Sequence, residues 1–294
     1  MQAKQNASSK FLHLTFPFLS FLYLLLIFGA PILFLKLLYD SFDNYYLKLA
    51  FFAFAPLFYA VIYVLIAGVL SLPSQHAIVS GKFPRKTDNR IYFHRRLYGL
   101  CWTSVYYFVP VFFVFLSFAK LKWFLFWLFG YRGSSSFTTY PDTWIRDLPL
   151  LSFGKNVYLS NKATIGTNIV LPNGRILVDK ITLEDSVTIG HLVMLAPGVH
   201  CCRRVEIGVG AQLGIKSFVG EDSKISPIVT IEHGVEIGRN VKIGIRSYVG
   251  TFTKIADDII VPPATVIPPR SIIKTQSDVE LFLTKQKIAE VAFE

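Results

Sequence analysis

A six-residue pattern of apolar and polar positions runs without a gap through residues 151–276. The third position of every block is apolar, from Phe153 to Ile273, and glycine follows it in nine blocks, among them Gly190 and Gly208. No α-helix has a period of six, whereas a chain that turns after each short strand does, and three such strands close one coil of eighteen residues. The pattern predicts a parallel β-solenoid of about seven coils, whose third-position side chains fill the axis.

Long apolar stretches precede these repeats. Phe16–Leu38 and Leu49–Leu70 are each predicted to form a membrane-spanning helix, because a span needs about 20 apolar residues. A third stretch contains Pro110 and is interrupted by Lys120 and Lys122. Three alternatives remain open for residues 98–131: one span with an interfacial helix, two kinked spans, or a re-entrant hairpin that returns to its starting side.

The patterns divide the chain into four parts. Residues 1–136 are predicted to form a helical membrane domain, 137–150 a linker with the solenoid cap, 151–276 the solenoid, and 277–294 a closing helix. Ser277 and Glu280 have the spacing of a capping box at the start of that helix.

Positive charge is concentrated in the first part of the chain. Residues 1–136 contain 13 Lys or Arg and 3 Asp or Glu, whereas residues 137–294 contain 17 and 16. The basic residues flank the apolar stretches, which is typical of a membrane protein, so we expect a lipid bilayer and no nucleic acid as partner. The predicted location is an inner or plasma membrane.

The distribution of loop charges also predicts an orientation. The loop at 71–97 contains six Lys or Arg and one acidic residue, Asp88. The positive-inside rule places this loop and the N-terminus in the cytoplasm. The solenoid is cytoplasmic as well if 98–131 returns to that side, whereas a third simple span would place it on the opposite side.

The repeat blocks, such as VEIGRN and VKIGIR, resemble those of the hexapeptide-repeat acyltransferase superfamily, whose fold is a left-handed β-helix. The resemblance implies an acyl donor that is acyl-CoA or a carrier-bound thioester, a histidine as general base, and assembly around a threefold axis. No metal is expected, because of the residue spacings described below. Membrane helices beside such repeats also resemble the terminal region of poly-lysine-type peptide synthetases. The expected function is a membrane-anchored acyltransferase that acts on a hydroxyl or amine of a lipid-linked or amphiphilic acceptor. The alternative is a non-catalytic scaffold that docks a partner enzyme at the membrane.

Three histidines of the repeat region are candidates for the base. His191, in VTIGHL, is the first choice, with Asn173 as a candidate orienting residue one coil before it, although Leu192 stands where the family has an acid. His233 follows Glu232, which could hold its imidazole. His200 is two coils from Glu236, too far for direct pairing.

Neither cysteines nor histidines have the spacing of a metal site. Cys201 takes a third position and is expected in the axis, and Cys202 takes the usual glycine position. The steps from His191 to His200 and from His200 to His233 are not multiples of eighteen, so these side chains are not expected to converge on zinc.

With an uninterrupted register, the sequence predicts which outward-facing residues stack on one another in successive coils. Stacking every eighteenth residue predicts a charge ladder at one corner and an uncharged face that another copy, a partner or the membrane domain would cover. The ladder consists of Asp185, Arg203, Glu221, Arg239 and Asp257, and the face contains Tyr158, Ile176, Met194 and Tyr248. The same register predicts no loop extruded from the solenoid, although many enzymes of the family have one over the acceptor.

Overall fold

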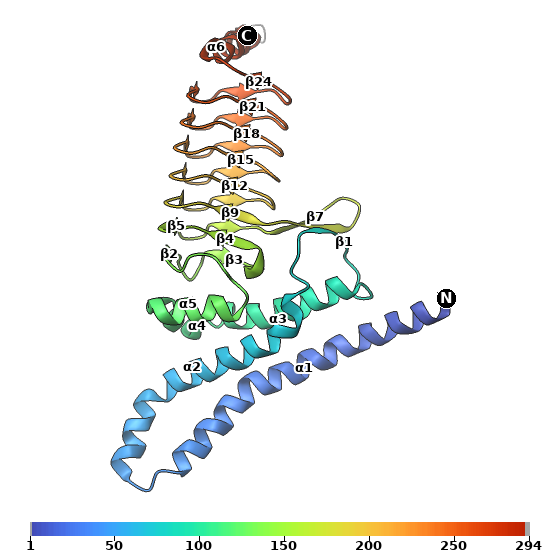
Figure 1. Ribbon diagram of the computed structural model, residues 1–294, viewed down its shortest axis with the longest axis vertical. Coiled ribbons are helices and arrows are strands. Elements are labelled where there is room, and N and C mark those ends of the chain that lie inside the picture. The colour runs from blue at the N-terminus through green and yellow to red at the C-terminus, as the bar shows by residue number, and fades with distance from the viewer. Residues whose placement is uncertain (1, 292–294) are drawn as a thin grey trace. The chain divides into compact units, whose positions relative to one another are not determined.

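The computed structural model describes residues 2–291, with side chains from 15 to 284. The chain divides into two units. The helical unit consists of Met1–Val79, Phe83–Tyr131 and Asn173–Arg175, and the solenoid unit consists of Ser80–Lys82, Arg132–Pro172 and Ile176–Glu294. Figure 1 shows both.

The helical unit begins with two long apolar helices, α1 (Gln2–Asp40) and α2 (Tyr45–Gln75). Thr15–Asp40 and Tyr45–Gln75 are each long and apolar enough to cross a membrane, in agreement with the two predicted spans. Most of their large side chains face outward, as expected of a surface that meets lipid. A short strand, β1 (Gly81–Pro84), follows.

The third apolar stretch forms three helices. They are α3 (Arg90–Tyr107), α4 (Val109–Ser117) and α5 (Ala119–Leu128). Pro110 lies in the first turn of α4, and the chain bends by 80° between α3 and α4, as in a broken span or a re-entrant hairpin. Trp102 is buried among the rings of Phe112, Phe126 and Phe129, so these helices pack around one aromatic core.

The solenoid has three parallel sheets of seven strands each, which we call the first, second and third faces. The first face contains β2 (Phe137–Thr138), β5 (Val157–Leu159), β10 (Thr188–Ile189), β13 (Glu206–Ile207), β16 (Lys224–Ile225), β19 (Lys242–Ile243) and β22 (Ile260–Val261). The second contains β3 (Trp144–Ile145), β6 (Thr164–Ile165), β11 (Met194–Leu195), β14 (Gln212–Leu213), β17 (Thr230–Ile231), β20 (Tyr248–Val249) and β23 (Val266–Ile267). The third contains β4 (Leu151–Phe153), β9 (Ile181–Leu183), β12 (His200–Cys201), β15 (Phe218–Val219), β18 (Glu236–Ile237), β21 (Lys254–Ile255) and β24 (Ile272–Ile273).

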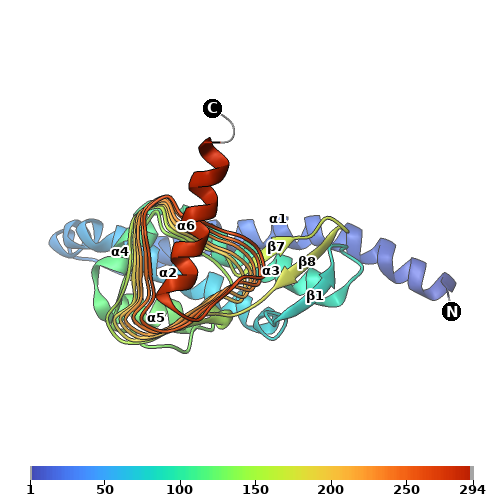
Figure 2. The same ribbon diagram turned by 90° about the horizontal axis from the view of Figure 1, so that it is seen from above.

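The coils superpose when viewed along the solenoid axis (Figure 2). Third-position side chains such as Leu159, Ile189 and Cys201 are fully buried in this axis, as predicted. The glycine that follows them is required by close approach, because a Cβ at Gly208 would lie 2.5 Å from the backbone nitrogen of Pro227 in the next coil. The left-handed turn residues occupy the sixth position instead, for example Arg246 at φ 59°.

The predicted start of the solenoid is too late. β2 and β3 already pair with β5 and β6, so 137–150, taken from the sequence as linker and cap, contain solenoid strands and the 3-10 turn η1 (Leu148–Leu150). These blocks lack the six-residue pattern, and only their pairing identifies them.

The prediction of an unbroken register is wrong at one place. β7 (Asn168–Val170) and β8 (Arg175–Val178) form an antiparallel hairpin that projects from the solenoid, as Figure 1 shows. Leu151 therefore pairs with Ile181, thirty residues away, instead of eighteen. The chain thus has the extruded loop that the register appeared to exclude. Buried Asp147 holds its base, since its carboxylate accepts hydrogen bonds from Thr167 and Asn168.

The hairpin also changes the composition of the faces. Tyr158 lies on the first face opposite Thr188, and Ile176 lies in the hairpin, so neither shares a face with Met194 and Tyr248. The observed second face is still without formal charge. Its outward residues are Trp144, Thr164, Met194, Gln212, Thr230, Tyr248 and Val266.

The last helix, α6 (Gln276–Val291), closes the solenoid and contacts β23 and β24. Ser277 lies inside the helix, so the predicted capping box is wrong. The Asp278 carboxylate instead accepts the N–H groups of Lys274 and Thr275. The side-chain amide of Gln276 bonds both backbone groups of Ile260, which satisfies the open edge of β22 as another strand would.

Candidate active site on the solenoid

The structure places the three candidate histidines at three different positions. His191 lies on the corner between the first and second faces, His233 on the corner between the second and third, and His200 on β12 of the third. Their side chains do not converge on one point, in agreement with the prediction from their spacing. Nothing in these positions alone selects one as a base, so the surroundings of each ring decide.

His191 does not have the predicted orienting residue. Asn173 lies at the tip of the hairpin, where its side-chain oxygen accepts the N–H of Arg175. Because of the hairpin, Asn161 lies one coil before His191, and its amide donates to Asp142. The His191 carbonyl accepts the N–H of Gly210, which fixes the turn.

His233 is held by the main chain. Its Nδ1 accepts the N–H of Ile215 at 3.0 Å, so the neutral ring carries its proton on Nε2. Glu232, which the sequence suggested as its partner, interacts with the Tyr248 hydroxyl; desolvation and then this carboxylate raise the pKa of Tyr248. With Nδ1 engaged and Nε2 protonated, His233 is arranged to donate a hydrogen bond.

His200 forms a pair with a carboxylate. Its Nε2 lies 2.8 Å from Oε1 of Glu184, and both side chains are a little more than one-third exposed. The ring also meets the edge of Phe218, with 5.3 Å between centroids. Because a carboxylate accepts the Nε2 proton, Nδ1 is left with a free lone pair, the arrangement that a general base needs.

Glu184 was not among the candidate residues of the sequence. Glu236, the only partner considered for His200, instead pairs with Lys254 at 2.9 Å. Glu184 follows β9 at the fourth position of its block, where glycine is usual, and Cys202 holds the same position in the next coil. A large or reactive residue at the glycine position is the signal that could have found the site.

Cys202 lies against the same carboxylate. Partial burial, and then Glu184 and Glu221, raise the pKa of the Cys202 thiol to about 11. The thiol is therefore protonated at neutral pH and is a poor nucleophile there. Its neighbour Cys201 is buried in the axis, and all three cysteines of the chain are free.

Two grooves of the solenoid lie beside candidate residues. One, of about 250 Å³, contains Glu184 and extends over Ser152, Gly154, Thr182, Asp185 and Arg203. The other, of about 340 Å³, lies between the base of the hairpin and the second face and includes Asn168, Ile169, Met194, Gln212 and His233. The groove beside the hairpin combines apolar walls with a few polar groups, as ligand sites commonly do, whereas the lining of the groove at Glu184 is mostly polar.

The corner beside Glu184 carries the predicted charge ladder. Arg203 contacts Glu221 at 3.2 Å, and Arg239 contacts Asp257 at 2.9 Å. Arg204 adds bonds to Glu221 and Asp222, and these hold the pKa of Asp222 below its ordinary value. The ladder is exposed, so each pair contributes little to stability on its own.

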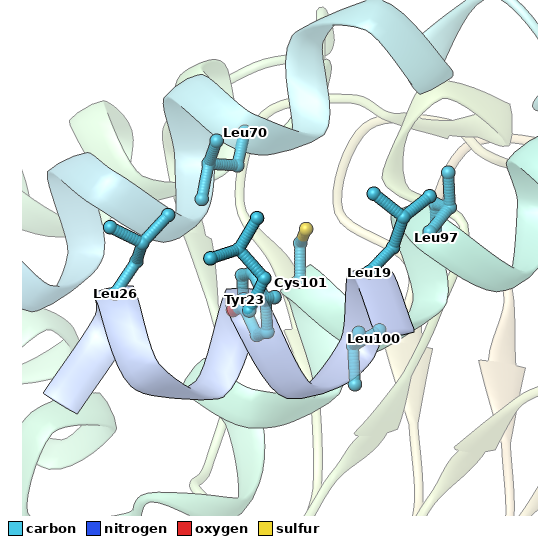
Figure 3. A pocket seen from close by; sticks show the side chains of 8 residues that line it. Leu19, Tyr23, Leu26, Leu70, Leu97, Leu100 and Cys101 are labelled. Carbon is cyan, nitrogen blue, oxygen red and sulfur yellow. The ribbon is translucent and has the colours of Figure 1, made fainter. Parts of the chain in front are cut away.

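The helical unit also contains a pocket. It has a volume of about 170 Å³ and is lined by leucines of α1, α2 and α3 together with Tyr23 and Cys101 (Figure 3). The Tyr23 hydroxyl bonds Ser104. The pocket surface is almost wholly apolar and suits an alkyl chain better than a polar ligand.

No family model and no curated protein matches the chain. Solved structures similar to it include a hexapeptide transferase family protein from Anaplasma phagocytophilum, at 20% identity over 33% of this chain and 59% of that one, with a TM-score of 0.31. Another is the acetyltransferase domain of PglB from Neisseria gonorrhoeae in complex with acetyl coenzyme A, at 15% identity over 52% and 62%, with a TM-score of 0.26. LpxA from Acinetobacter baumannii is 14% identical over 48% and 66%, with a TM-score of 0.23. The match thus spans about three fifths of the first two chains, and the function of this protein is inferred from its own residues.

Proposed function

We propose that this protein is a membrane-anchored acyltransferase. It moves an acyl group from a coenzyme A or carrier-bound thioester to a hydroxyl or amine of a lipid-linked or amphiphilic acceptor. The 2.8 Å contact between His200 and Glu184 carries the proposal, because it supplies an oriented base on a half-exposed surface. The repeat pattern, which resembles that of hexapeptide acyltransferases, supports the same reaction class.

The pair would act as follows. Nδ1 of His200 takes the proton of the acceptor as its oxygen or nitrogen attacks the thioester carbonyl. The Glu184 carboxylate keeps Nε2–H in place and stabilises the imidazolium that forms. When the tetrahedral intermediate collapses, the carbon–sulfur bond breaks and the imidazolium returns the proton to the leaving thiolate. The products are the acylated acceptor and the free thiol.

Two features of the chain support an amphiphilic acceptor. The helices α1 and α2 are suited to a bilayer, and the pocket around Tyr23 suits an alkyl chain. The hairpin supplies the extruded loop that covers the acceptor in many enzymes of the resembling family.

The test uses the full chain in detergent. Radiolabelled acetyl-CoA is added with lipids extracted from the membranes of the producing cells, and label in the lipid fraction and free thiol are measured. We expect saturable acetyl-CoA binding and transfer of label, with transfer lost in His200→Ala while binding remains. A chain that binds no acetyl-CoA, but co-purifies stoichiometrically with an enzyme, would instead be a scaffold.

We also propose that the solenoid is cytoplasmic, on the same side as the 71–97 loop. Ser80→Cys and Lys254→Cys, both at exposed positions, should resist an impermeant thiol reagent in intact cells and react after lysis. Lys254 is used because its neighbour Thr253 is fully buried. Labelling of Lys254→Cys in intact cells would place the solenoid outside and remove its access to cytoplasmic acyl-CoA.

A further inference from the structure

Three different metal-binding side chains meet on the corner after the third face. The ligand atoms of Glu184, His200 and Cys202 all lie within 4.8 Å of one another. Glu184 and Cys202 occupy equivalent positions in adjacent coils, and His200 comes from the strand that leads to Cys202. The cluster offers one carboxylate oxygen, one imidazole nitrogen and one thiol sulfur.

This donor set matches a particular class of ion. Zinc and related divalent transition metals bind nitrogen, sulfur and carboxylate oxygen together, whereas magnesium and calcium prefer oxygen alone. With metal–ligand distances of about 2.0–2.3 Å, tetrahedral ligand atoms lie roughly 3.3–3.7 Å apart. The 2.8 Å contact between His200 and Glu184 is shorter than this range, and the 4.8 Å limit of the cluster is longer. Small side-chain rotations therefore suffice to form the site.

We infer that Glu184, His200 and Cys202 bind a divalent transition-metal ion such as Zn²⁺, and that the bound ion switches off the general base. The second part rests on the proposed function, whereas the first does not. All three residues are half-buried. Three protein ligands leave a fourth position open to water, so the site can load from solvent.

The switch follows from proton positions. Without metal, Nε2 of His200 carries the proton that Glu184 accepts, and Nδ1 is free. A metal ion can bind Nε2 only through a lone pair on that nitrogen, so Nε2 must give up its proton. The ring proton then resides on Nδ1, and the imidazole stays neutral. The Cys202 thiol loses its proton to solvent, and Glu184 turns from the imidazole to the ion. An Nδ1 that carries a proton cannot take one from an acceptor.

Cobalt(II) titration of the metal-free full chain in detergent tests the site directly. Cobalt replaces zinc in such sites and gives a near-ultraviolet charge-transfer band when a thiolate binds it. We expect this band in the wild type and in Cys101→Ser, and its loss in Cys202→Ser. Glu184→Gln and His200→Ala should each weaken cobalt binding more than about tenfold, since even the loss of outer-shell partners costs that much.

The acetyl-transfer assay tests the switch. Each protein is compared with its own metal-free rate, and Zn²⁺ should lower transfer in the wild type at concentrations that leave Cys202→Ser unaffected. Absence of a Cys202-dependent band overturns the metal site and leaves the acyltransferase proposal to the His200 test. A band with a rate that Zn²⁺ does not change overturns the switch. A band in a protein that transfers no acyl group supports the metal site and contradicts the proposed function.

Discussion

Nε2 of His200 and Oε1 of Glu184 lie 2.8 Å apart, although sixteen residues separate them in the chain. The contact joins an outward strand position of one coil to the corner of the coil before it. Neither His191 nor His233 has a carboxylate partner of this kind among the described side chains. Of the three histidines in the repeat region, we therefore expect His200 to be the general base.

Three single substitutions test this ranking. His200→Ala should lower acyl transfer by roughly two to four orders of magnitude, the usual cost of losing a general base. His191→Ala and His233→Ala should retain most of the wild-type rate, and they serve as matched controls because all three residues are on the outside of the same solenoid. Turnover is followed as free thiol released from acetyl-CoA. A normal rate in His200→Ala together with loss in His191→Ala would return the base to His191, the first choice of the sequence.

Deletion of residues 169–180 should leave a folded solenoid. These two blocks form most of the hairpin, and without them Asn168 joins Ile181 in the regular six-residue pattern. We expect the circular dichroism spectrum and the melting temperature to stay close to those of the wild type, while acyl transfer is lost. Deletion of 169–179 is the matched control, since one surplus residue breaks the register and should lower the melting temperature. If both deletions melt alike, the hairpin is part of the solenoid core.

Glycine at the fourth position should be required by space alone. Gly208→Ala places a Cβ 2.5 Å from the Pro227 nitrogen, and overpacking of this kind typically costs about 1–3 kcal/mol of the free energy of unfolding. Arg246→Gly makes the opposite exchange at a left-handed position with φ 59°, and should be neutral or slightly stabilising. Denaturant unfolding of the solenoid measures both. Equal destabilisation by the two changes would contradict the steric explanation.

Arg204→Ala should reveal a pH-dependent contribution of Asp222. Hydrogen bonds from Arg204 lower the pKa of Asp222 in the folded protein from its ordinary value of 3.8. A lowered folded pKa stabilises the fold above that ordinary value, and the stabilisation is lost as the pH falls through the lowered one. The wild type should therefore melt above the variant at neutral pH, and the difference should shrink as the pH falls below about 4. A constant difference would exclude this ion pair as its source.

The uncharged second face should mediate self-association. Met194 is 45% exposed on that face, and Met194→Lys would place a charge in the contact between copies. We expect mass photometry in detergent to show an oligomer for the wild type and smaller particles for Met194→Lys. Thr188→Lys, on the first face, is the matched control and should leave assembly intact. An oligomer that survives Met194→Lys removes the second face as the interface.

The sequence by itself determined the solenoid, because its pattern is local. Each block must place an apolar side chain in the axis, and a residue with more than a hydrogen atom at the fourth position often meets the next coil. Ile189, Gly208 and Ile237 are thus understood without any knowledge of pairing. The two long apolar helices were determined in the same way, by length and composition.

Tertiary structure alone decided where the register is interrupted. Leu171 and Leu177 satisfy the six-residue pattern, yet they belong to a hairpin, in which Leu177 pairs with Ile169 and Leu171 directly follows β7. Because of the hairpin, strands before it pair with strands thirty residues later in the chain instead of eighteen. For this reason Tyr158 was assigned to the wrong face and Asn173 to the wrong corner.

The candidate site was likewise decided by tertiary structure. His200 and Glu184 differ by a number of residues that fits neither the block nor the coil, so no periodic reading of the chain brings them together. They meet because one side chain leans along its strand and the other fills the corner position that glycine usually leaves empty. The period of the sequence specifies which residues stack, whereas contacts between a strand and a corner depend on side-chain length and direction, which only the folded coils define.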